Sequence, residues 1–96
     1  MIKITRNAGF HITFENGYTV SVQFGPGTYC DNHDKRFDDQ EKCGEYGSSN
    51  AECAVWKDDG DLIECRGWGN TVKGWMTPDE ILKLLNWAAR QKKESK

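Results

Sequence analysis

The segment Phe10–Phe24, FHITFENGYTVSVQF, constrains the fold most, because apolar and polar residues alternate on both sides of an Asn-Gly pair. A two-residue loop would pair Phe14 with Thr19 and place the two apolar sets on opposite faces. A three-residue loop instead pairs Phe14 with Tyr18 and keeps both sets on one face. The sequence therefore predicts a β-hairpin of this second register, with Gly17 in the left-handed conformation.

A second hairpin is predicted around the turn Asp58–Gly60. Its strands are Asn50–Trp56 and Leu62–Arg66, and their alternation places Cys53 opposite Cys65 on the core face. Facing cysteines on antiparallel strands can form a disulfide, but two packed thiols are the favoured reading in a reducing compartment.

The remaining elements complete an α+β fold. A short strand is expected at Ile2–Thr5 and a last strand at Thr71–Met76. Thr77, followed by proline and by glutamate three residues on, is typical of a helix start, and the apolar stripe that follows predicts a helix over 78–92. We expect an antiparallel sheet of about five strands with this C-terminal helix packed on one face.

Size and charge limit the class of protein. A chain of 96 residues with 36% hydrophobic content suits a single domain, 1–96, and is too short for two independent cores. Thirteen basic and fifteen acidic residues give a net charge of -2, without the basic excess of a phosphate-backbone binder. We therefore expect no direct nucleic-acid binding. The sequence does not indicate the oligomeric state.

No segment has the composition of a membrane span or a signal peptide. The longest apolar runs fall well short of the ~20 residues needed to cross a bilayer, and Met1–Thr5 lacks a long apolar core. A cytoplasmic protein without membrane contact is the simplest expectation, and in that compartment its four cysteines would stay reduced.

The long loop over 25–50 is the first place to look for function. Asp, Asn, Gly and Lys dominate it, and apolar periodicity is nearly absent. Structureless loops beyond ~15 residues are uncommon inside compact domains and are then usually functional or disordered. Its ordering is more readily explained by a partner than by burial within the domain.

The order of segments resembles that of known small proteins. NGYTVSVQFG, an aromatic and polar loop, AECAVW, a DG turn and a PDE helix start are similar to α+β proteins of unassigned role encoded by phages and prophages. This resemblance implies an accessory protein in the host cytoplasm that binds a host component. It implies no active-site residue, and it favours Cys53 as a core-filling residue.

Metal and catalytic chemistry have weak support. A zinc site would draw on cysteine and histidine side chains, and the candidates are Cys30, His33, Cys43, Cys53, Cys65 and His11. Only Cys30 and His33 have the close spacing of a ligand pair, so we expect no metal and no other cofactor. Nucleophilic catalysis needs a base and a third orienting group, and no such group can be named. We therefore expect a protein that is not an enzyme.

Aromatic residues outside the core give the more useful signal, because tryptophan, tyrosine and arginine supply most hot-spot energy in protein interfaces. The candidate partner-binding residues are Tyr29, Arg36, Phe37, Trp56, Trp68 and Trp75. The leading hypothesis is a non-catalytic inhibitor or modulator of a host protein, such as a component of an anti-phage defence system.

Three other readings stay open. The first is a protein that sequesters a nucleotide-like ligand, with Tyr29 and Trp68 stacking on it and Arg36 neutralising it. The second is a zinc-stabilised interaction module. The third is that part of the loop folds over Trp56 and Trp75 as a minor second core.

Overall fold

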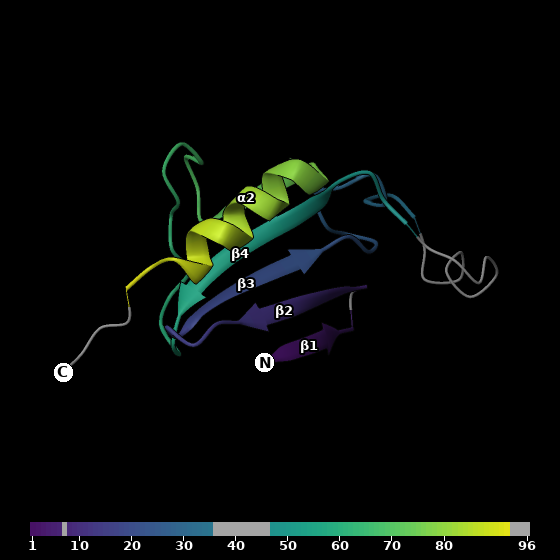
Figure 1. The fold of residues 1–96 in the computed structure, drawn as a ribbon. Coiled ribbons are helices and arrows are strands. Elements are labelled where there is room, and N and C mark those ends of the chain that lie inside the picture. Colours follow the sequence, from purple (N-terminus) through teal and green to yellow (C-terminus); the bar gives the residue numbers. More distant parts are fainter. Residues whose placement is uncertain (7, 36–46, 93–96) are drawn as a thin grey trace.

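The structure is a computed structural model that describes residues 1–6, 8–35 and 47–92. Its strands are β1 (Ile2–Thr5), β2 (Gly9–Thr13), β3 (Tyr18–Gln23), β4 (Ala51–Lys57) and β5 (Val72–Met76), and they precede the helix α2 (Pro78–Ala89). The strands form one antiparallel sheet in the order β1-β2-β3-β4-β5. The helix lies on one face of this sheet (Figure 1), which confirms the predicted α+β fold.

The first hairpin has the predicted register. Phe10 pairs with Val22, as expected for the three-residue loop. The Phe14 N–H donates to the Tyr18 carbonyl at 2.9 Å, and Gly17 has a φ of +90°. The three-residue loop keeps the apolar side chains of both hairpin strands on the face that α2 covers. This requirement selects the loop length.

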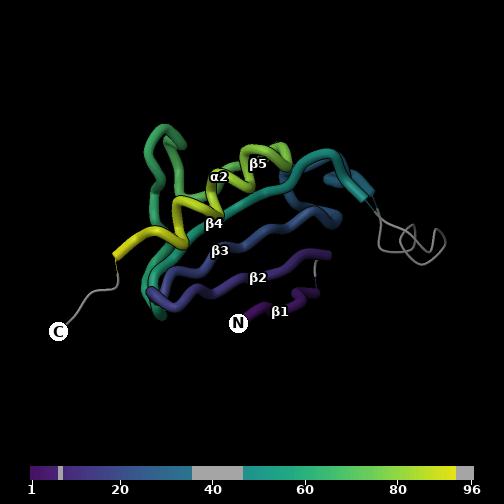
Figure 2. The backbone as a smooth tube through the Cα atoms, viewed as in Figure 1, coloured from purple at the N-terminus to yellow at the C-terminus, as the bar shows by residue number. Residues whose placement is uncertain are grey.

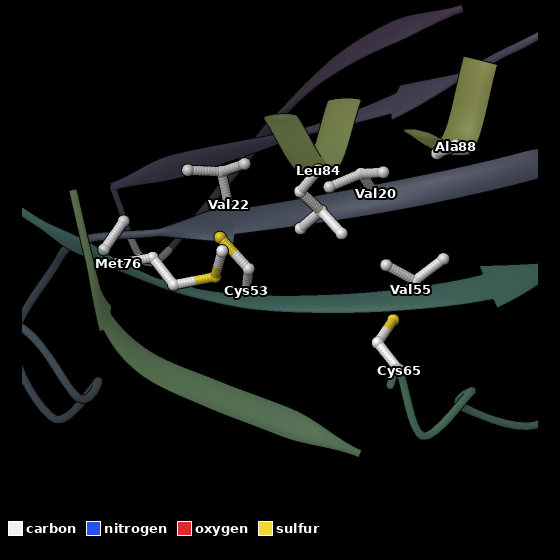
Figure 3. Close-up of a cluster of buried hydrophobic side chains, with 9 residues drawn as sticks. Val20, Val22, Cys53, Val55, Cys65, Met76, Leu84 and Ala88 are labelled. Atoms are coloured by element: carbon white, nitrogen blue, oxygen red, sulfur yellow. The ribbon is translucent and has the colours of Figure 1, made fainter. Parts of the chain in front are cut away.

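One hydrophobic core lies between the sheet and α2 (Figure 3). Val20 and Val22 from β3 and Val55 from β4 meet Leu84 and Ala88 from the helix. The predicted core positions Ala51, Cys53 and Cys65 are also buried. Leu84 and Ala88 thus lie on the predicted helix stripe, and Ile81 and Leu85 of the same stripe are partly buried against the core.

The helix starts as predicted and ends earlier than predicted. Glu80 donates its backbone N–H to Thr77 Oγ1 at 3.3 Å and accepts the Thr77 N–H at 3.0 Å, which completes a capping box. The helix ends at Ala89 rather than at residue 92. Here the Asn16 side chain bonds the Ala88 carbonyl at 2.8 Å, so a contact distant in sequence fixes the helix end.

The prediction of a strand over Leu62–Arg66 is wrong. The expected strand is reduced to a single bridge between Trp56 and Leu62, which does have the expected register. Beyond this bridge Cys53 pairs with Lys73 of β5 instead of Cys65. The edge of β4 can hold one neighbour, so the intervening chain leaves the sheet and rises beside α2 (Figure 2).

The described part of the chain contains no helix with the length and apolar character required to span a bilayer.

Candidate functional site

The structure brings together two of the predicted binding residues, Tyr29 and Trp75. Trp56 lies on the sheet face that α2 does not cover, and Trp68 lies in the segment between β4 and β5. Arg36 and Phe37 lie outside the described residues, as do Cys43 and the rest of the range 36–46. The site is therefore built around Tyr29 and Trp75.

Tyr29 docks along the outer edge of β5. The Trp75 N–H donates to the Tyr29 carbonyl oxygen at 2.8 Å, which ties the loop to the edge strand. The side chains of Tyr29 and Trp75 remain 53% and 54% exposed. We call these two residues and His33, whose ring stacks on Tyr29 with centroids 5.8 Å apart and planes 19° apart, the aromatic platform.

A β-bulge sets the position of Trp75. Ala51 pairs with Met76 and Cys53 pairs with Lys73, so two residues of β5, Gly74 and Trp75, oppose the single residue between them. Trp75 has a φ of +57°, in the left-handed region. A bulky side chain is rare there, and the conformation costs about 1–3 kcal/mol.

Glu52 and Gly74 hold Tyr29 against the bulge. The Glu52 Oε2 atom accepts the Tyr29 backbone N–H at 2.7 Å. Gly74 leaves the room for this approach, because a β-carbon there would overlap Tyr29 Cβ and lie 3.0 Å from the Tyr29 carbonyl oxygen. Glu52 was not predicted as a site residue and His33 was considered only as a metal ligand, since only the bulge and the loop bring them beside Tyr29.

The base of the long loop is tied together by hydrogen bonds. The Asn32 side chain is 1% exposed and donates to the carbonyls of Phe24 at 2.7 Å and Gly47 at 3.0 Å. Asp31 bonds the backbone N–H of Ser49 at 3.1 Å and the side-chain amide of Asn50 at 3.0 Å. Part of the loop that was expected to gain little burial is thus fixed by the domain itself.

These bonds also act on the Asp31 carboxyl. The Ser49 hydroxyl donates to it, and this bond is the largest cause of a lowered Asp31 pKa. The Ser49 backbone N–H and the Asn50 amide lower the pKa further. Hydrogen bonds to the charged form favour that form, so Asp31 is a carboxylate that clamps the two ends of the loop.

Trp56 belongs to a different surface. Its ring meets His11 edge-on, with centroids 5.0 Å apart, on the uncovered face of the sheet. Burial lowers the pKa of His11, and the nearby Lys3 lowers it further, so the imidazole is kept neutral. Trp56 therefore lies on the open sheet face and is not part of the aromatic platform.

The described cysteines considered for metal or thiol chemistry are buried, and His33 is hydrogen-bonded within the domain. Cys30 is buried, with its Sγ 3.2 Å from Thr28 Oγ1, and His33 Nδ1 donates to the Thr28 carbonyl at 3.0 Å. Burial raises the pKa of Cys53 to about 12 and raises that of Cys65 as well. Within the ranges that the structure describes, no three His, Cys, Asp or Glu side chains gather as a metal site.

An apolar cleft opens on the helix face, on the side of β2. Its volume is about 380 Å³, and its walls include Phe10, Phe24, Ile81 and Leu82. The neighbouring strand β1 exposes Ile2 and Ile4. This cleft is the main apolar surface, among the described residues, that competes with the aromatic platform for a binding role.

Comparison with protein-family models, with curated proteins and with solved structures gave no significant match to this chain.

Proposed function

We propose that this chain is a non-catalytic protein-binding domain whose contact surface is the aromatic platform. The observation that carries the proposal is the Trp75 indole, which is held exposed on a left-handed backbone by a bond to Tyr29. Both features oppose stability in the isolated domain, because exposed aromatic surface is hydrated and the left-handed backbone is strained. A partner that buries the platform would recover the hydrophobic part of this cost.

The chemistry of the platform suits a protein surface. Exposed aromatic side chains with few rotatable bonds lose little entropy on binding and dominate interface hot spots. Tyr29 is further immobilised by Glu52 and by the stacked His33 ring, so less ordering remains to be done when a partner binds.

The resemblance to phage proteins extends the proposal to a host protein as partner, such as a component of an anti-phage defence system, which this chain would inhibit or modulate. Arg36 and Phe37 remain hot-spot candidates within this proposal, because they follow Tyr29 and His33 in the same long loop of the sequence.

Quantitative capture from bacterial lysate tests this function. The tagged protein is compared with Tyr29→Ala and with Leu82→Ala, a control that removes a similarly exposed apolar side chain, 57% exposed, from the apolar cleft. We expect one host protein to be enriched by the parent and by Leu82→Ala, and to be recovered about tenfold less with Tyr29→Ala. Loss with Leu82→Ala alone would assign binding to the apolar cleft and contradict the platform.

A further inference from the structure

A second concave site lies on the other side of α2 from the apolar cleft. The segment between β4 and β5 rises beside the helix, on the same face of the sheet (Figure 1, Figure 2). A cavity of about 680 Å³ lies between them, lined by Cys65, Arg66, Gly67, Trp68, Lys73, Met76, Glu80, Lys83, Leu84 and Trp87. This volume is within the ~300–1,000 Å³ usual for small-molecule sites.

The cavity is positively charged although the chain is not. Arg66, Lys73 and Lys83 line it from three different elements, while the whole chain has a net charge of -2. Glu80 is the one acidic side chain in its described lining. The Glu80 carboxylate interacts with Lys73 and Lys83, but one negative charge offsets only part of the charge of three cations.

Two tryptophan side chains, Trp68 and Trp87, line the same cavity. Trp68 sits between Gly67 and Gly69, both with positive φ, in a turn closed by a bond of 3.1 Å from the Trp68 N–H to the Cys65 carbonyl. Trp87 is 40% exposed, and Tyr18 meets it edge-on with centroids 5.9 Å apart. Trp68 is partly buried against the core and Trp87 contacts the Tyr18 ring, so both indoles are positioned before any ligand binds, and flat rings stack on such surfaces.

We propose that this cavity binds a small, flat, aromatic anion of the nucleoside-phosphate class. The indole of Trp68 stacks on the base, and Lys73, Lys83 and Arg66 neutralise the phosphate. A phosphate group prefers ammonium and guanidinium donors, and a base prefers an aromatic face, so the ligand that satisfies the whole lining contains both groups. A cavity of this volume beside one helix suits one nucleotide better than an extended strand.

This site is independent of the aromatic platform. Its residues come from α2, from the segment before β5 and from Lys73 and Met76 of β5, and none of them is a platform residue. Either proposal can therefore fail while the other holds.

Titration calorimetry on the intact protein tests the site. The probes are AMP, GMP, CMP and UMP, with adenosine, inorganic phosphate and a double-stranded oligonucleotide for comparison. We expect at least one mononucleotide to bind once per chain with a Kd below about 1 mM. We also expect adenosine and inorganic phosphate each to bind at least about tenfold more weakly, because each lacks half of the recognised chemistry.

Variants separate the contributions of stacking and charge. Trp68→Leu should weaken mononucleotide binding by about tenfold, in line with the worth of one stacked base, and Lys83→Gln by about threefold to tenfold, as for one charged contact. Lys83 is exposed, so that change keeps the fold even if Trp68→Leu does not. The matched control is Lys35→Gln, which removes an equally exposed cation outside the cavity.

Three results would overturn the proposal. The first is no saturable mononucleotide binding up to several mM. The second is equal binding of inorganic phosphate, which would leave no role for the indoles. The third is tighter binding of the duplex, or equal weakening by Lys35→Gln and Lys83→Gln, either of which would show a diffuse charge effect.

Discussion

The Asn16 side-chain amide donates a hydrogen bond of 2.8 Å to the backbone carbonyl of Ala88, joining the first hairpin turn to the end of α2. The same amide donates to the Gln91 carbonyl at 2.7 Å, and Asn16 is nearly buried. The last carbonyls of a helix have no partner within it. One side chain of the turn therefore donates both to a carbonyl in the last turn of α2 and to a carbonyl just beyond the helix.

Replacing Asn16 tests this tertiary cap. Asn16→Ala should lower the free energy of unfolding by about 1–3 kcal/mol, because it removes both of these hydrogen bonds, one of which is buried. Asn16→Asp keeps the shape but should cost at least as much, since a carboxylate cannot donate and faces the negative end of the helix dipole. Urea unfolding measures both variants. Parent-like stability in both would show that Asn16 does not fix the helix end.

The conformation of Gly17 allows backbone strain and crowding to be separated. Gly17 has a φ of +90°, and a β-carbon there would also overlap Asp58 Oδ1, whereas Gly27 has a φ of +84° with open space around it. Gly27→Ala should therefore cost about 1 kcal/mol from backbone strain alone, and Gly17→Ala should cost more. Thermal unfolding gives the order. A Gly17→Ala variant as stable as the parent would contradict the three-residue turn.

The capping box makes a specific prediction for Thr77. Thr77→Ala removes the Oγ1 acceptor of the Glu80 N–H and should lower the free energy of unfolding by about 1 kcal/mol. Thr77→Ser keeps an acceptor at the same place and serves as the control. If chemical denaturation finds equal losses for serine and alanine, the hydroxyl contributes nothing to the cap.

The Asp31 clamp predicts a pH dependence at the loop base. Because its pKa is lowered in the folded state, its contribution is present above the ordinary value of 3.8 and is lost as the pH falls through the lower folded value. Ser49→Ala removes the bond that lowers this pKa most and should move it upward, towards 3.8. Carboxyl NMR titration measures the shift, with Thr13→Ala as a distant control. An unchanged Asp31 pKa in Ser49→Ala would contradict the clamp.

The sequence predicts the parts of this fold that depend on local periodicity. The first hairpin register follows from alternation in Phe10–Phe24, and the start of α2 follows from the residues around Thr77. The strand Leu62–Arg66 was mispredicted because its alternation is locally correct, while β5 takes the same edge of β4. Competition between two strands for one edge depends on contacts distant in sequence.

For the candidate sites, too, the sequence predicts local features but not contacts between distant segments. Exposure of Tyr29 and Trp75 agrees with the prediction that they lie outside the core. Of the two residues of the suggested minor second core, Trp75 is exposed and Trp56 is partly buried. Their adjacency depends on a bulge that opposes two residues of β5 to one of β4, which no local pattern indicates. The cluster of Arg66, Lys73 and Lys83 likewise arises only when the segment before β5 rises beside α2.

Trp75→Gly tests the central claim most directly, because glycine relieves the left-handed strain and removes the indole together. In an ordinary strand glycine is less stable than alanine, but at a φ of +57° we expect Trp75→Gly to be about 1 kcal/mol more stable than Trp75→Ala. The deciding measurement is the affinity of Trp75→Gly for the host protein that the parent captures. We predict at least about tenfold weaker binding by a folded variant. Parent-like affinity in that variant would contradict the aromatic platform as the contact surface.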